Sequence, residues 1–77
     1  MKIKNEHIIN AFTSLDELMQ GMREGSLSLF LSPKAMFVMG QFYEWAKPIV
    51  KNEGIDLEAE TEVPDELAWV VEEALSW

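Results

Sequence analysis

Three stretches of this chain place apolar side chains at every third or fourth residue, which is the period of one face of an α-helix. The clearest is residues 5–24, where the repeating positions are Ile8, Phe12, Leu15, Met19 and Met22. At about 100° per residue, these positions cover about 120° of a helical wheel. They predict a helix over 5–24 that Asn5 caps at its start and Gly25 closes in a left-handed conformation.

A second interpretation of this stretch comes from the sequence Ser14-Leu15-Asp16-Glu17, which has the pattern of a capping box. A capping box starts a helix, so the chain would break near Thr13 into two shorter helices. One helix is favoured, because the apolar stripe passes Thr13 without a change of phase.

A second helix is predicted over residues 33–52. Ser32 and Pro33 are typical of a helix start, since serine caps the first turn and proline fits the first helical position. The apolar residues fill about 180° of the wheel, so we expect this helix to be covered on more than one side and to lie at the centre of the fold. Pro48 should kink or end it, with a last turn at residues 52–54.

The third helix is predicted over residues 64–76 and begins at a proline. Asp65 and Glu66 in its first turn favour the positive end of the helix dipole. Its core stripe consists of Leu67, Val70, Val71, Ala74 and Leu75, with Ala68 and Trp77 at the margins.

Residues 55–63 alternate strictly between apolar or neutral residues and carboxylates. This period of two is typical of a half-buried strand, although Ala and Glu are poor strand formers and Pro64 ends the run. We expect an extended segment laid against the helices. Pairing with the serine- and leucine-rich residues 26–31 would make a short two-stranded ribbon.

The length and the absence of cysteine limit how this fold is stabilised. A chain of 77 residues buries only about 60% of its unfolded surface, and no disulfide is available. With His7 as its one histidine, a zinc site is not expected, so neither a metal nor a cofactor is predicted. The prediction is a mainly α, compact three-helix domain over residues 1–77 that is stabilised with help from a partner or a second copy, and the same domain with a two-stranded β-ribbon at its edge is the runner-up architecture.

The charge is divided unequally along the chain. Residues 1–51 carry six basic and five acidic side chains, whereas residues 52–77 carry nine acidic and no basic ones, which accounts for the net charge of −8. Such an imbalance in charge gives information about the binding partners of the protein rather than about its fold. A protein partner with a basic surface is therefore the first expectation.

Trp69 is the strongest candidate for a contact residue. It points about 200° away from Leu67 in the core stripe, and carboxylates lie one turn to either side. An aromatic side chain ringed by charge joins a large apolar contact to groups that attract a basic partner. The alternative is that Trp69 packs under residues 55–63. The carboxylates around it are Asp65, Glu66, Glu72 and Glu73.

Two further sites are weaker candidates. Phe37 lies among polar residues on the outer side of the second helix, beside Gly40, and is either a contact or an incidental exposed side chain. In an extended segment, alternate carboxylates would stand about 6.6 Å apart. Such a row imitates a nucleic-acid backbone, although a solvated acidic face is the more usual explanation. The row consists of Asp56, Glu58, Glu60 and Glu62.

Several classes of function are not expected. His7 has no nucleophile at a motif spacing, and no serine lies in a G-x-S-x-G turn, so an enzyme is not predicted. Direct nucleic-acid binding is disfavoured by the excess of acidic groups. No apolar run suits a membrane span or a secretory signal, so a cytoplasmic location is expected. The order of elements resembles many small proteins of phages and prophages, but no motif carries that likeness.

The leading hypothesis is a non-enzymatic interaction protein whose acidic C-terminal third, anchored by Trp69, docks on a basic partner, in one form as an inhibitor of a nucleic-acid-binding protein. The alternative is a structural homo-oligomer formed through the apolar face of helix 33–52. Salt distinguishes them, because acidic docking weakens with ionic strength and apolar self-association does not.

Overall fold

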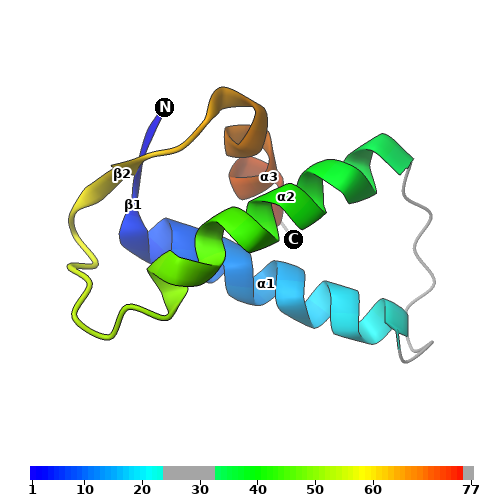
Figure 1. Ribbon diagram of the computed structural model, residues 1–77, viewed down its shortest axis with the longest axis horizontal. Helices are drawn as coiled ribbons and strands as arrows, with labels where there is room; N and C mark the ends of the chain where they lie inside the picture. Colours follow the sequence, from blue (N-terminus) through cyan, green and yellow to red (C-terminus); the bar gives the residue numbers. More distant parts are fainter. Residues whose placement is uncertain (24–32, 76–77) are drawn as a thin grey trace.

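The computed structural model describes residues 1–23 and 33–75, and within them it has three helices and two short strands (Figure 1). The helices are α1 (Asn5–Arg23), α2 (Pro33–Val50) and α3 (Asp65–Leu75), and the strands are β1 (Lys2–Lys4) and β2 (Glu60–Glu62). The predicted mainly α fold with a two-stranded ribbon is therefore confirmed. Helix α1 is continuous through Thr13, as the unbroken stripe indicated. Gly25 lies outside the described residues.

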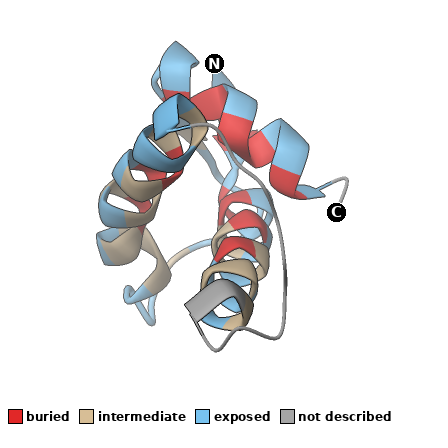
Figure 2. Ribbon diagram, turned by 90° about the vertical axis from the view of Figure 1, so that its right-hand side faces the viewer, coloured by how far each residue is buried: buried red, intermediate tan, exposed pale blue. Residues whose placement is uncertain are grey.

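The core lies between the three helices, and the buried positions of each helix are on the side turned toward the other two (Figure 2). Among the fully buried side chains, Ile8 and Leu15 come from α1, Phe42 from α2, and Val70 and Val71 from α3. Burial of apolar surface of this kind contributes roughly 1.5–3 kcal/mol for each large side chain. Ile3 of β1 and Val63, just after β2, close the core beside the ribbon.

The prediction that the second helix lies at the centre is wrong, because α1 packs extensively on both other helices while α2 and α3 touch less. Helix α3 has 11 residues and α2 has 18, which correspond to lengths of about 16 Å and about 27 Å. So short a helix covers only part of α2. The wide apolar surface of α2 is consequently left half-buried at Val38, Trp45 and Ile49.

The end of α2 also differs slightly from the prediction. Pro48 lies within the helix, which continues for two more residues to Val50. A turn follows, in which the Gly54 amide donates a hydrogen bond to Asn52 Oδ1 at 3.1 Å. The proline therefore marks the last turn of the helix and does not interrupt it earlier.

The start of α1 is capped from a distant part of the chain, not by the Asn5 side chain as predicted. The backbone amides of Asn5 and Glu6 donate to the carbonyls of Ala59 at 2.9 Å and Leu57 at 3.1 Å. Because these carbonyls satisfy the first two amides of the helix, the Asn5 side chain is left to bind other groups. Its amide donates to the Asp56 carbonyl at 2.9 Å, and its Oδ1 accepts from the Thr61 hydroxyl.

The ribbon pairs the N-terminal residues with β2 in an antiparallel register that sets Lys2 opposite Glu62, Ile3 opposite Thr61 and Lys4 opposite Glu60. The predicted partner, residues 26–31, lies outside the described residues, and β1 takes that place in the sheet. Strand β1 has only three residues, with one buried position between two exposed ones. So short a pattern does not identify a strand from the sequence alone.

The extended conformation predicted for residues 55–63 is confirmed only at its end. Residues 56–59 form a turn, closed by hydrogen bonds from the Ala59 amide to the Asp56 carbonyl and from the Glu58 amide to Asp56 Oδ1. Aspartate favours such turns because its side chain can bond the backbone two residues on. The turn leaves Leu57 48% exposed, whereas Val63 beyond β2 is fully buried.

Candidate interaction surface

Trp69 projects outward from α3, as the wheel geometry predicts. Its neighbours Ala68 and Val70 are buried, whereas 45% of the Trp69 side chain is exposed. Leu75, which the sequence placed in the core stripe, is exposed as well, because it lies in the last described turn, past the end of the core. Trp77 lies outside the described residues.

The exposed side of Trp69 borders a hollow of about 400 Å³ between α2 and α3. We call this hollow the Trp69 groove, and it is lined by Lys34, Ala35, Val38, Glu66 and Trp69. Its apolar part comes from both helices, and its two charged side chains have opposite signs. Trp69 therefore faces α2, and the alternative in which it packs under residues 55–63 is not what the structure shows.

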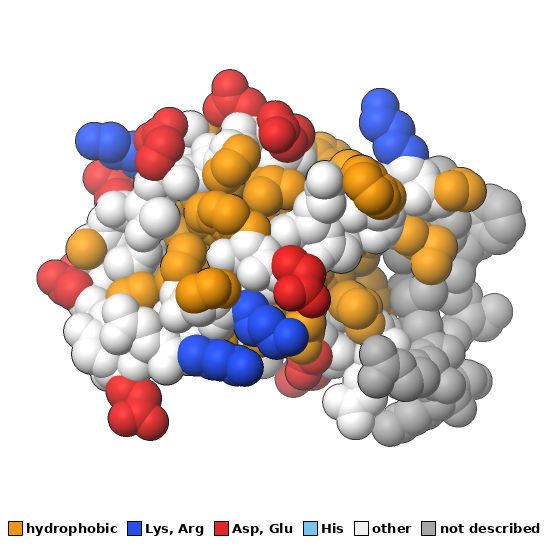
Figure 3. Space-filling view, viewed as in Figure 1, with side chains coloured by type: hydrophobic (Ala, Val, Ile, Leu, Met, Phe, Trp, Pro, Cys, Tyr) orange, Lys and Arg blue, Asp and Glu red, His pale blue; other side chains and the backbone are white. Residues whose placement is uncertain are grey.

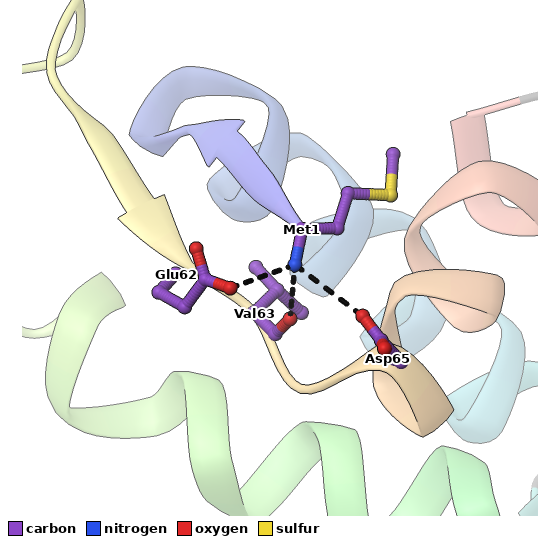
Figure 4. Close-up of polar contacts among 4 residues, drawn as sticks. All are labelled: Met1, Glu62, Val63 and Asp65. Carbon is purple, nitrogen blue, oxygen red and sulfur yellow. Dashed lines mark hydrogen bonds and ion pairs between the residues drawn. The ribbon is translucent and has the colours of Figure 1, made fainter.

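The fold brings positive groups of the N-terminus to the acidic residues of the C-terminal third (Figure 4). The Met1 amine donates to Glu62 Oε1 at 2.9 Å, to the Val63 carbonyl at 3.1 Å and to Asp65 Oδ1 at 3.4 Å. Antiparallel pairing of β1 with β2 places the amine there, since the Val63 amide donates to the Met1 carbonyl at 2.8 Å. Glu62 and Asp65 thus have a role within the fold.

These contacts raise the pKa of the Met1 amine above its ordinary value of 8.0. The hydrogen bond to Glu62 is the largest cause, and the contact with Asp65 acts in the same direction. Desolvation opposes both, because it disfavours the charged form. The amine is consequently held in its protonated, positively charged form.

The carboxylate row that suggested nucleic-acid mimicry does not form a regular line. Asp56 lies in the turn at 56–59, and Glu60 and Glu62 lie in β2. Glu58 forms an ion pair with Lys4, whose Nζ lies 3.3 Å from Glu58 Oε2. The spacing of about 6.6 Å applies only within an extended segment. The geometric basis of the mimicry hypothesis is therefore wrong.

The acidic side chains do not form one continuous patch. Figure 3 shows one face, on which several acidic groups gather along the upper edge and others stand singly, with basic and hydrophobic side chains among them. Every carboxylate predicted as a contact is exposed. Glu66 lines the Trp69 groove, whereas Glu60 and Glu72 line another hollow with Lys2, Lys4 and His7, next to the ribbon. Glu73 is exposed and lines neither hollow.

Phe37 is exposed, as predicted, but it does not join the Trp69 groove. At 65% exposure it is the most exposed large apolar side chain of the described residues. It borders a separate, shallow hollow with Met36, Gly40, Gln41 and Glu44 on the outer side of α2. The fold therefore divides the predicted contact residues into several surfaces.

Sequence reasoning missed the α2 side of the groove, namely Lys34, Ala35 and Val38. A signal was available, because Lys34 and Val38 are four residues apart and share one edge of the helix. The sequence does not show where α3 lies, and the position of α3 decides which edge of α2 lines the groove with Trp69.

Searches of protein-family models, curated proteins and solved structures find no match for this chain. Within residues 1–23 and 33–75, no helix has the length and apolar character needed to cross a membrane. The same described residues contain no group of three or more histidine or carboxylate side chains that could hold a metal ion. The fold and the groove thus define a small three-helix domain with an exposed indole between two helices.

Proposed function

We propose that this chain is a non-enzymatic interaction module that docks the Trp69 groove on a basic surface of a partner protein. The observation that carries the proposal is the 45% exposure of Trp69 beside an apolar hollow with Glu66 at its edge. A large aromatic side chain next to a hollow is typical of residues that dominate the energy of protein interfaces.

The exposed part of the indole is large enough to act as an anchor. An aromatic side chain buries about 150–250 Å², so the exposed share of Trp69 corresponds to about 100 Å². Removing that area from water would contribute about 2.5 kcal/mol, close to a hundredfold in affinity. Val38 and Ala35 provide the apolar surface on which a partner side chain would pack.

The charges favour a basic partner with a defined orientation. The net charge of −8 attracts basic proteins over distances of about one Debye length, about 8 Å at physiological salt. At the groove, a basic side chain of the partner would lie near Glu66, away from Lys34 at the opposite edge. Proteins that bind nucleic acids carry such basic surfaces, so masking one of them is the specific form of the proposal.

The test compares proteins captured from a lysate by the wild-type chain and by two variants. Trp69→Ala removes the anchor, and Leu75→Ala is the matched control, because Leu75 is also on α3 and is 47% exposed but lies outside the groove. We expect a basic protein that the wild type and Leu75→Ala capture and Trp69→Ala does not. Glu66→Gln should weaken capture more than Glu53→Gln, and capture should decrease as salt rises.

Circular dichroism must show that Trp69→Ala remains folded. If the folded variant captures the same proteins as the wild type, the groove is not the docking site. Capture that is independent of salt would exclude the electrostatic part of the proposal.

A further inference from the structure

Four residues form an exposed stripe along the outer side of α2, and we call it the outer α2 stripe: Lys34, Phe37, Gln41 and Glu44. Their spacing of three, four and three residues places them on one face of the helix. This face is opposite to the buried Met39, Phe42 and Ala46. The stripe therefore takes no part in the core of the domain.

Phe37 is the apolar centre of the stripe. With 65% of its side chain in water, and Met36 next to it at 52%, it forms an apolar area that the described fold leaves uncovered. Exposed apolar groups gathered at one place are typical of interaction sites. A domain of 77 residues also gains stability from any contact that covers such an area.

Gly40 leaves open space beside Phe37. A methyl group added at Gly40 would have no neighbouring atom within 4 Å, so packing inside the domain does not require a glycine there. A glycine within a helix costs about 1 kcal/mol relative to alanine. The hollow that Gly40 lines with Phe37, Gln41 and Glu44 measures about 550 Å³. It offers a place for an aromatic side chain from outside.

The charges of the stripe make it complementary to itself. Lys34 lies at one end and Glu44 at the other, and both are five residues from position 39. Phe37 and Gln41 are each two residues from the same position. When two copies of α2 are set antiparallel about a twofold axis at residue 39, each Lys34 faces the other copy's Glu44, and each Phe37 faces the other copy's Gln41 and the hollow at Gly40.

We infer that this chain forms an antiparallel homodimer through the outer α2 stripe. A parallel arrangement would set Lys34 against Lys34 and Glu44 against Glu44, which is unfavourable. The stripe itself has one charge of each sign, so it adds no repulsion to that of the acidic residues elsewhere. The ion pair of Glu44 with Lys47 within one chain is loose, at 4.0 Å, and Glu44 is 74% exposed and accessible to a second copy.

This inference is independent of the proposed function, because the stripe and the Trp69 groove are different surfaces. They share Lys34, which lines the groove and begins the stripe. Dimer formation is therefore measured as the molar mass of the purified chain, and no partner protein is needed. Trp69→Ala should leave the mass unchanged, so failure of one proposal is distinguishable from failure of the other.

The test is sedimentation equilibrium of the purified chain over a range of concentrations. We expect a dimer with twice the monomer mass of 8.8 kDa. Phe37→Ser should abolish it. Gly40→Leu should also abolish it by filling the hollow, while the helix becomes more stable because leucine is a better helix former than glycine. Loss of association in a more stable chain separates association from folding.

A charge exchange tests the antiparallel geometry. Lys34→Glu and Glu44→Lys should each raise the dissociation constant about tenfold, because each creates two like-charge contacts in the dimer. The double variant Lys34→Glu/Glu44→Lys should restore the dimer by forming the same pairs in reverse. A chain that stays monomeric, a dimer that survives both Phe37→Ser and Gly40→Leu, or a double variant weaker than either single one would each overturn the inference.

Discussion

The side-chain amide of Asn5 donates a hydrogen bond to the backbone carbonyl of Asp56 at 2.9 Å, and this contact joins the first turn of α1 to the turn that precedes β2. Asn5 is buried, and it also accepts a hydrogen bond from Thr61. One side chain thus holds the turn, the ribbon and α1 in a fixed relation. This places β2 beside β1 and Val63 in the core.

Asn5→Ala is therefore expected to destabilise the protein by about 1–2 kcal/mol, because it removes the partner of a part-buried carbonyl and of a part-buried hydroxyl. Urea unfolding followed by circular dichroism measures the change. Asn10→Ala is the matched control, since Asn10 is on the same helix but exposed, and alanine is the better helix former there. Equal stability of the two variants would show that the Asn5 contacts contribute little.

The amine of Met1 gives the 77-residue chain a stability that depends on pH. Because the pKa of this amine is raised in the folded state, its contribution is fully present below the unfolded pKa of about 8 and is lost as pH rises through the folded value. We expect the urea midpoint to fall between pH 7.5 and the onset of lysine titration, at about pH 9.5. Glu62→Gln should reduce this fall, whereas Glu53→Gln, which is far from the amine in the sequence and exposed, should not.

Phe12 of α1 and Tyr43 of α2 stack with ring centroids 4.6 Å apart and an interplanar angle of 18°. A double-mutant cycle of Phe12→Leu and Tyr43→Leu should give a coupling energy of about 1 kcal/mol. Tyr43→Phe keeps the stack and removes the hydrogen bond from the hydroxyl to Asp16 Oδ1, so it should cost less than about 1 kcal/mol. Additive single variants would mean that the rings do not interact favourably.

Gly40→Ala is expected to stabilise the monomer by about 1 kcal/mol. The position is within α2, and a methyl group there meets no atom within 4 Å. Gly54→Ala is the control, because it lies in a turn outside the helix and should gain less. Thermal unfolding at a low protein concentration measures both variants without a contribution from association, and a loss of stability in Gly40→Ala would contradict the prediction.

Phe42 is fully buried between the helices, so Phe42→Ala should cost about 3–5 kcal/mol through the lost transfer energy and the cavity left behind. That is a large part of the stability of a domain of this size. Phe37→Ala is the matched control, because the same side chain is removed from an exposed position of the same helix. Chemical denaturation at a low protein concentration, where association does not contribute, should show a clear difference between the two.

For the predicted contact residues, the sequence predicts the direction of a side chain but not its neighbours in space. The outward direction of Trp69 follows from the helix period, since Trp69 falls outside the stripe that Leu67 and Val70 define. Its neighbours in space, Lys34 and Val38, come from a helix more than thirty residues earlier, and no local pattern relates them to α3. The pairing of charges was equally hidden from the sequence. Glu62 and Asp65 have no basic residue near them in the sequence, but in the fold they lie beside the Met1 amine.

The sequence alone determined the three helices, their approximate ends and the direction of Trp69 and Phe37, because helix periods and proline or capping positions are properties of neighbouring residues. Tertiary structure decided which strand pairs with β2, which helix lies at the centre and which carboxylates stand beside positive groups. These outcomes depend on contacts between residues far apart in the sequence, such as Phe12 with Tyr43 and Asn5 with Asp56. Such contacts are fixed by the packing of the whole chain, and no short segment carries the information.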